Sequence, residues 1–518
     1  MKPSKALLPL LAILLASCAS NGESLSDSSS SVDDGPGYYK AEAVNENIDL
    51  HDVYTSQSTP NLPSVGTYNV LVLPIELNGY PFSEEDLQTI DIALTGEASE
   101  TNYWETLPSF YEQSSFGNLH IEAEIASVTH IDYTPAELFR NFGGAGSDYC
   151  LKQGVRNYIG ENGKGSTKKF DANEDGMIDA TIMIYSCPDA DSSEIGHIDP
   201  YADLFWAYTV YDVDGLTSAD ADSPVGFYYF WSSLDSFLGA RQGQIDCHTV
   251  IHEFGHILGA DDYYDADYQE NGWDFPAGGS IMMDNNVGDH DIATKLLYGW
   301  VKPYVVAGDA TITINPSQEN GDCILLADSW NGTGFDEYIL IELYTPDGLN
   351  RQDAETVYEG YGHALPSEPG IRMWHVDFRL AYGPGFQGSN FMDVDYLTDE
   401  QTAAGEYPEY CIYNGTPYKS ALCVSASNSN YMRSLSAIEN QFNALQLIQA
   451  GGDYTFGSLG AHMTDDDLFH EGDEFSIGTH SDFFKNEKFN NGASIDFVIS
   501  VDSLSADQAT LSFRRVNG

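Results

Sequence analysis

Two histidines and a glutamate in one short stretch could perform metal chemistry together. The stretch reads His252-Glu253-Phe254-Gly255-His256, so the two imidazoles are four residues apart. On an α-helix these positions lie on one face, where both imidazoles can bind a single ion. Glu253 is close enough to that ion to take a proton from a water bound to it. The spacing therefore predicts a helix that carries a metal site and its general base.

The residues after this helix offer a third ligand. Gly259 is expected to end the helix, because a residue without a Cβ can turn the chain back. Asp262, ten residues after His252, then reaches the third ligand position. The full pattern H-E-x-x-H-x-x-G-x-x-D resembles the extended signature of the metzincin zinc peptidases, with aspartate where most members have histidine. This resemblance implies zinc bound by His252, His256 and Asp262, with Glu253 as the catalytic base.

Two other choices of third ligand remain open. Glu270 and Asp274 form an E-x-x-x-D of the kind that thermolysin-like enzymes use, although it follows His256 at a short interval. Glycine and tryptophan inside that segment make it a poor helix. Asp261 is one residue out of register with the metzincin pattern. Asp262 is therefore the preferred ligand.

A methionine further along the chain fits beneath such a site. Met282, in Ser280-Ile281-Met282, has the place of the methionine turn of metzincins, where a thioether forms a soft floor under the histidines. The tyrosine often found two residues later is Asp284 here. A tyrosine hydroxyl from this turn therefore cannot be assumed to stabilise an oxyanion.

A second candidate metal site is an acidic loop before a predicted strand. Oxygens at alternate positions and a glycine at the sharp turn suit calcium. Position 12 of the loop is Ile182 rather than glutamate, so the loop is no EF-hand, and a turn without an ion is the alternative. The candidate calcium ligands are Asp171, Asn173, Asp175, Met177 and Asp179.

The N-terminus has the features of an exported lipoprotein. Lys2 and Lys5 precede a short apolar run, and Leu15-Ala16-Ser17-Cys18 resembles a bacterial lipobox. The resemblance implies cleavage after residue 17, a lipid on Cys18 and attachment to the extracytoplasmic face of a membrane, or secretion if the signal is an ordinary one. Residues 19–37 are rich in Ser, Asp, Asn and Gly and are expected to form a flexible tether.

The net charge restricts the partners of the chain. Against 80 acidic residues stand 21 basic ones, which gives a formal charge of −59. Such a surface makes nucleic acid an implausible partner. It is suited to solubility outside the cell or to the binding of divalent cations. Seven cysteines include Cys18, and the even remainder allows disulfides, of which Cys411 with Cys423 is a plausible local pair.

Several apolar patterns predict the elements that position these residues. Strands are expected at 68–77, 119–125, 180–185, 337–342 and 370–377, and helices at 107–116, 244–258 and 291–300. The segments E-Y-x-L-I-E and G-x-x-x-W-H-V-D, together with the motifs above in the same order, resemble the immune inhibitor A group of secreted bacterial metallopeptidases. The resemblance covers residues 68 to 380. His375 and Asp377 lie in a predicted strand and are expected to be structural.

These observations predict an α+β fold, with a metzincin-like catalytic domain followed by a β-rich, sandwich-like accessory region. The expected divisions are 1–17 signal peptide, 18–66 lipidated terminus and linker, 67–303 catalytic domain and 304–518 C-terminal region. The expected function is a membrane-tethered zinc endopeptidase acting on proteins or peptides outside the cell, with zinc and calcium as cofactors. The alternative is a catalytically silent surface lipoprotein that binds glycan or protein. An intact Glu253 argues against the alternative.

Overall fold

The computed structural model describes most of the residues from Pro36 to Gly518, which belong to one unit. The residues of the expected signal peptide, Cys18 and residues 19–35 of the expected tether lie outside the described residues. In the two strands at 409–413 and 416–419 only the backbone is described. The other described residues are 36–42, 62–99, 102–198, 203–238, 243–260, 262–264, 275–334, 336–358, 362–378, 443–457, 460–490 and 492–516.

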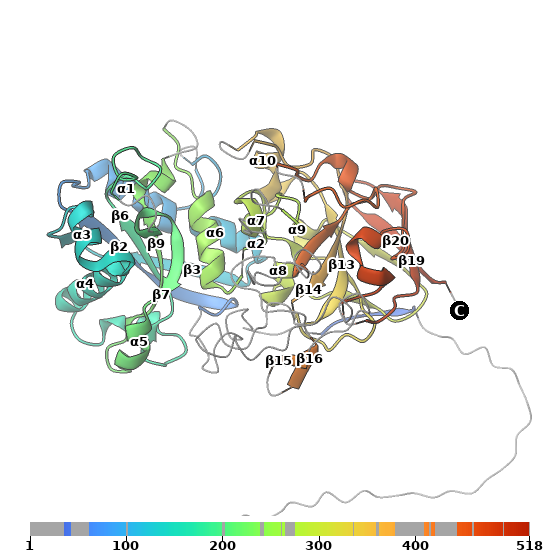
Figure 1. Ribbon diagram of the computed structural model, residues 1–518, viewed down its shortest axis with the longest axis horizontal. Helices are drawn as coiled ribbons and strands as arrows, with labels where there is room; N and C mark the ends of the chain where they lie inside the picture. Colours follow the sequence, from blue (N-terminus) through green and yellow to red (C-terminus); the bar gives the residue numbers. More distant parts are fainter. Residues whose placement is uncertain are drawn as a thin grey trace, which may run out of the picture. The chain divides into compact units, whose positions relative to one another are not determined.

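The first half of this unit is built on a mostly parallel sheet (Figure 1). Its strand order is β3-β2-β6-β9-β7, with β4 also paired to β2, and only β7 runs antiparallel to its neighbour. The strands are β2 (Gly66–Leu77), β3 (Leu119–Ile125), β4 (Thr129–Ile131), β6 (Thr181–Tyr185), β7 (Tyr208–Tyr211) and β9 (Tyr228–Ser233).

Helices cover both faces of this sheet. Side chains on β6 alternate between two cores, so that Ile182 and Ile184 pack on one face and Met183 and Tyr185 on the other. A strand buried on both faces needs a continuous apolar run, which explains the sequence of β6. One face carries α1 (Glu84–Thr95), α2 (Leu107–Ser114) and α6 (His248–Ile257), and the other carries α3 (Pro135–Phe142) and α4 (Gly146–Asn162).

The second half contains two packed sheets. A six-stranded sheet has the order β1-β10-β12-β13-β14-β17, and a four-stranded antiparallel sheet has the order β11-β20-β19-β18. Apolar side chains from both sheets form one core between them. The strands are β1 (Tyr38–Lys40), β10 (Tyr304–Val306), β11 (Ala310–Ile314), β12 (Ile324–Leu326), β13 (Glu337–Tyr344), β14 (Gly370–Asp377), β17 (Leu445–Ile448), β18 (Glu474–Phe475), β19 (Phe497–Leu504) and β20 (Ala509–Arg515).

Short elements complete the unit. Three of them, the small helices α7, α8 and α10, lie after α6 in the sequence and return in the description of the candidate metal centre. These elements are α5 (Val213–Ser218), α7 (Met282–Asn285), α8 (Ile292–Leu297), α9 (Ser317–Asn320), α10 (Arg351–Glu355), β5 (Met177–Ile178), β8 (Val225–Gly226), β15 (Glu409–Tyr413) and β16 (Thr416–Lys419). None of the helices in the described residues has the length and apolar character needed to span a membrane.

The six-stranded sheet also packs against the core of the first half. On β13, Ile339 and Ile341 face the four-stranded sheet, whereas Leu340 belongs to the core that contains α6 and α8. Figure 1 shows α6, α7 and α8 between the mostly parallel sheet and β13–β14. Residues on both sides of the expected boundary at 303 therefore share one core. The N-terminal strand β1 pairs with β10 in the same sheet, so part of the expected linker belongs to the fold.

The mixed helical and strand content is consistent with the α+β class. The predicted strands at 68–77, 119–125, 180–185, 337–342 and 370–377 are confirmed within two residues at their ends. The helix that carries the H-E-x-x-H pattern begins at His248 rather than at Gln244. The reason is that Ile245 forms a bridge with Asn102, and its carbonyl accepts the N–H of Tyr103, which takes the preceding segment out of the helix.

Leu340→Ala tests whether the two halves form one folding unit. Removal of this buried side chain should lower the free energy of unfolding by about 2–5 kcal/mol, because it leaves a cavity in the shared core. We expect chemical denaturation, followed by tryptophan fluorescence and far-UV circular dichroism, to give a single transition at lower denaturant. Two separate transitions, with only one of them shifted, would contradict a shared core.

Candidate metal centre

The helix α6 ends in a turn that folds the chain back under its own histidines. Gly259 has φ +103°, a conformation that side chains with a Cβ rarely adopt. The N–H of Gly259 donates to the carbonyl of His256, and the N–H of Ala260 donates to the carbonyl of Gly255. These two bonds form a Schellman motif, which satisfies carbonyls at the helix end. The turn sends the chain toward Asp262, as the signature requires.

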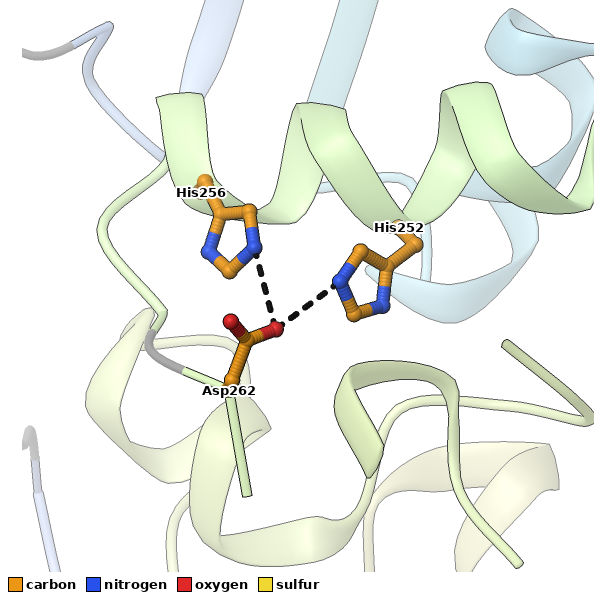
Figure 2. Close-up of side chains that lie close together, drawn as sticks. All are labelled: His252, His256 and Asp262. Carbon is orange, nitrogen blue, oxygen red and sulfur yellow. Dashed lines mark hydrogen bonds and ion pairs between the residues drawn. The ribbon is translucent and has the colours of Figure 1, made fainter. Parts of the chain in front are cut away.

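His252, His256 and Asp262 converge (Figure 2). Both histidines project from α6 toward one oxygen of the aspartate. The distances from Asp262 Oδ1 are 3.0 Å to His252 Nε2 and 3.3 Å to His256 Nε2. Among the described residues this is the one cluster of three His, Cys, Asp or Glu side chains whose possible ligand atoms all lie within 4.8 Å of one another.

Backbone carbonyls fix the ring orientation of both histidines. His252 Nδ1 lies 2.8 Å from the carbonyl oxygen of Met282, and His256 Nδ1 lies 2.8 Å from that of Ala260. A carbonyl oxygen can only accept, so each Nδ1 must carry the hydrogen. In a neutral imidazole the Nε2 lone pair is then directed at the centre of the cluster. This is the tautomer and orientation that a metal ligand needs.

The charges in the cluster favour a cation at its centre. Burial lowers the pKa of His256, but the negative charge of Asp262 and the hydrogen bond to it outweigh this effect and raise the pKa. Burial likewise raises the pKa of Asp262, yet the positive charge of His256 and the hydrogen bonds from both histidines lower it overall. The carboxylate therefore remains ionised and attracts a positive charge, either a proton on the imidazole or a metal ion.

Glu253 is buried beside this cluster. Glu253 is 8 % exposed, and Thr209 Oγ1 on β7 lies 2.9 Å from both Glu253 Oε2 and the Glu253 carbonyl oxygen, which share its one hydrogen. Burial raises the pKa of Glu253, which brings the carboxyl group closer to the range needed to accept and return a proton near neutral pH. Thr209 had no signal in the sequence, because it lies 44 residues before Glu253 on a different element.

Four hydroxyl groups, three from helices or strands and one from the residue after α8, contact the backbone of α6. They come from Tyr111 of α2, Thr209 of β7, Tyr228 of β9 and Tyr298 after α8. Their hydrogen bonds end on the carbonyls of Ile251, Glu253, His256 and Gly255, respectively. A carbonyl oxygen has two lone pairs, so each of these groups can accept a hydroxyl in addition to a backbone N–H, and the added bonds fix the helix. The position of the two histidines is thereby tied to the sheet and to α8.

The residues of the expected methionine turn contact α6 through their backbone and through a side chain. Met282 is fully buried at the start of α7, and its carbonyl is the acceptor for His252. The neighbouring thioether, from Met283, packs against α6: a Cβ added to Gly255 would lie 2.4 Å from Met283 Sδ. Asp284, in place of the tyrosine, is buried and accepts the N–H of Gly279 at 2.6 Å. This residue therefore caps the turn.

The second oxygen of Asp262 has its own partner. The hydroxyl of Tyr264 donates to Asp262 Oδ2 at 2.8 Å, which leaves Oδ1 directed at the histidines. Such a bond orients a ligating carboxylate. The adjacent Tyr263 is buried, and its hydroxyl accepts from Thr294 at 3.1 Å. The competing ligands Asp261, Glu270 and Asp274 lie outside the described residues.

The loop with the candidate calcium ligands is folded back on itself. Asp171 accepts the N–H groups of Asp175 and Gly176, and Asn173 accepts that of Asp175. Asp175 accepts the N–H of Met177, which begins β5. These bonds are typical of turns built by Asp and Asn. The carboxylate oxygens of the loop do not form a group of three within 4.8 Å of one another. Among the described residues, only His252, His256 and Asp262 form such a group.

Asp179 is the unusual member of this loop. It is fully buried, and Oδ2 accepts the N–H of Ala172, whereas Oδ1 has no hydrogen-bond partner. Burial, with a further contribution from the charges of Asp175 and Asp171, raises the pKa of Asp179 to about 8. A buried carboxyl group with an unsatisfied oxygen is costly. A cation bound by this oxygen would remove the cost.

Other residues singled out in the sequence have structural surroundings. His375 is buried, with Nδ1 3.1 Å from the carbonyl of Phe483 and Nε2 2.9 Å from Glu337. Asp377 accepts from the side chain of Asn490. The cysteines whose side chains are described are buried and unpaired, namely Cys150, Cys187, Cys247 and Cys323. Cys423 lies outside the described residues, as do the side-chain contacts of Cys411.

Comparison with known proteins adds no assignment: no protein-family model matches the chain, and no curated protein matches it.

The protonation of the cluster predicts a proton-linked metal affinity. Asp262 raises the pKa of His256, so we expect His256 to hold a proton at neutral pH when no metal ion is bound. A metal ion bound by His256 Nε2 would displace this proton, so its affinity should rise about tenfold per pH unit between pH 6 and 8. Competition with a chromophoric chelator at several pH values measures the slope. An affinity independent of pH over this range would contradict the account.

Proposed function

We propose that this chain is a metzincin-like zinc endopeptidase that hydrolyses proteins or peptides outside the cytoplasm. The lipid anchor at Cys18 would attach it to the membrane. One observation carries the proposal: two imidazole nitrogens and a carboxylate oxygen converge while a buried glutamate stands beside one of these histidines. The H-E-x-x-H-x-x-G-x-x-D pattern and its resemblance to the immune inhibitor A group support it.

The donor set fits zinc. Donors bound to one zinc ion at about 2.1 Å in a tetrahedron are about 3.4 Å apart. The two Nε2–Oδ1 distances, 3.0 and 3.3 Å, require only a small outward movement to reach that value. Two nitrogens with one oxygen also suit zinc better than calcium or magnesium, which prefer oxygen ligands throughout. His252, His256 and Asp262 would therefore hold the ion.

The side chains of the site have distinct roles in peptide hydrolysis. Bound zinc would supply a Lewis acid that lowers the pKa of water and polarises the scissile carbonyl. Glu253 would accept the proton of the attacking water and deliver it to the leaving amine. Thr209 keeps the Glu253 carboxylate in one orientation through its hydrogen bond. Tyr264, Met282 and Ala260 keep the three ligands oriented.

Calcium is a second proposed cofactor. Asp179 supplies the argument, because its Oδ1 is buried without a partner and its negative neighbours Asp171 and Asp175 lie in the same loop. The loop also leads directly into β6, which is central in the mostly parallel sheet. Calcium bound there would stabilise the entry of this strand rather than take part in catalysis.

Glu253→Gln separates a peptidase from a silent binding protein. The amide keeps the size of the side chain but cannot act as a base, so turnover should fall by about 10²–10⁴-fold. Zinc content and circular dichroism should remain as in the wild type. Casein hydrolysis and metal analysis on chain that starts at Cys18 measure both. The matched variant Glu124→Gln, on β3, should retain activity.

Two results would reject the peptidase. The first is full casein hydrolysis in Glu253→Gln, because the general base would then lie elsewhere. The second is zinc-loaded wild-type protein without hydrolysis of any protein substrate, which would favour the binding lipoprotein.

Calcium should raise the thermal stability of the zinc-saturated wild type. At a concentration 100 times the dissociation constant the gain is about 2.7 kcal/mol. Asp179→Asn should abolish the gain, because the amide replaces the charged ligand. Asp507→Asn, an exposed change in the turn between β19 and β20, should preserve it. Differential scanning fluorimetry across a calcium titration decides the matter, and an equal gain in both variants would exclude this site.

A further inference from the structure

The first residue of the catalytic helix lies in a buried charged network. His248 is fully buried, with Nδ1 2.6 Å from Asp246 Oδ1 and Nε2 3.3 Å from Asp353 Oδ2. Both carboxylates are themselves buried. A carboxylate oxygen accepts, so both ring nitrogens carry hydrogens and the ring is an imidazolium. Burial lowers the pKa of His248, but the hydrogen bonds to Asp246 and Asp353 outweigh it and raise the pKa to about 9.

Two aromatic rings enclose this imidazolium. Trp104 stacks on one side, with ring centroids 4.4 Å apart and 20° between the planes. Tyr358 also stacks on His248, at 4.1 Å and 25°, and its hydroxyl donates to Asp246. A cation against aromatic faces in a desolvated site is held firmly. The ring plane, and with it the start of α6, therefore has little freedom.

Asp353 connects this network to a second element of the site. It belongs to α10, which lies in the connection between β13 and β14 of the six-stranded sheet. The same oxygen that faces His248 also accepts the N–H of Gly288 at 2.8 Å. Gly288 follows α7, and the next residue, Asp289, donates its N–H to Asn350 Oδ1 at 3.1 Å. One carboxylate thus contacts both the start of α6 and the loop after α7.

These two elements together orient a proposed zinc ligand. His252 lies one turn after His248 on the same face of α6. Its Nδ1–H donates to the carbonyl of Met282 at the start of α7. The direction of the His252 imidazole therefore depends on the position of α6 relative to α7. Asp353 is placed to fix that position.

We propose that Asp353 is a positioning residue of the metal centre, which acts from the C-terminal β-rich region through His248 and Gly288 on His252. The inference rests on the proposed zinc site. It assigns the C-terminal region a part in metal binding, beyond an accessory role. Asp353 does not touch the ligands, so its removal should weaken zinc binding without abolishing it.

The test compares two buried acids of the C-terminal region. Asp353→Asn removes the charge at α10. Glu342→Gln is the matched control. Glu342 is equally buried on β13, and its polar contacts are with Ser317, Trp374 and Arg372, which belong to neither α6 nor α7. The zinc dissociation constant is measured for both by chelator competition in the full chain, and the cobalt-substituted proteins are compared by their d–d absorption.

We expect Asp353→Asn to weaken zinc binding by about 10-fold or more and to alter the cobalt spectrum, as changes beside metal ligands usually do. Glu342→Gln should keep wild-type affinity and spectrum even where its thermal stability falls. Wild-type affinity in Asp353→Asn would overturn the inference. An equal loss in Glu342→Gln would also overturn it, because the effect would then reflect general stability.

A milder variant keeps the test decisive if Asp353→Asn does not fold. Tyr358→Phe retains the stacked ring and removes only the hydroxyl that donates to Asp246. We expect a smaller loss of zinc affinity in the same direction, and no loss would overturn the inference. Wild-type protein that binds zinc but hydrolyses nothing would reject the peptidase alone. Unchanged zinc binding in the variants of an active enzyme would reject the positioning role alone.

Discussion

Two hydrogen bonds from imidazole nitrogens to backbone carbonyls determine what the site can bind. They fix the Nδ1–H tautomer of His252 and His256, and so direct both Nε2 atoms at Asp262. A different ring orientation would leave the same residues unable to share an ion. Much of the surrounding structure holds the two carbonyls in place. Gly259 and the helix-terminating turn position Ala260, and α7 positions Met282.

This constraint involves both halves of the described unit, because α7, whose Met282 carbonyl orients His252, packs in the core that they share. α7 and α8 belong to a core that also includes the inner face of the six-stranded sheet. The strands β13 and β14 are buried on both faces, one against this core and one against the four-stranded sheet. The proposed metal site depends on the position of α6 relative to α7, and the packing of these strands would make that position rigid. Asp353 adds direct contacts between the C-terminal region and these elements, through His248 of α6 and Gly288 after α7.

The sequence predicted the elements with strong apolar patterns and the local part of the site. The run in β2, the glycine after α6 and the spacing of His252, His256 and Asp262 are all local features, so they could be recognised without a structure. The start of α6 was placed too early, because the bridge from Ile245 to Asn102 is a tertiary contact. Thr209 and Asp353 could not be predicted, since their roles depend on residues far away in the sequence.

The central claim is that these two imidazoles and this carboxylate hold one zinc ion. Zinc K-edge X-ray absorption, with metal analysis, on the chain that starts at Cys18 tests the claim most directly. The account predicts one zinc per chain, with two imidazoles and light oxygen ligands at about 2.0–2.2 Å. Folded protein without stoichiometric zinc, or a zinc shell containing sulfur at about 2.3 Å, would contradict it.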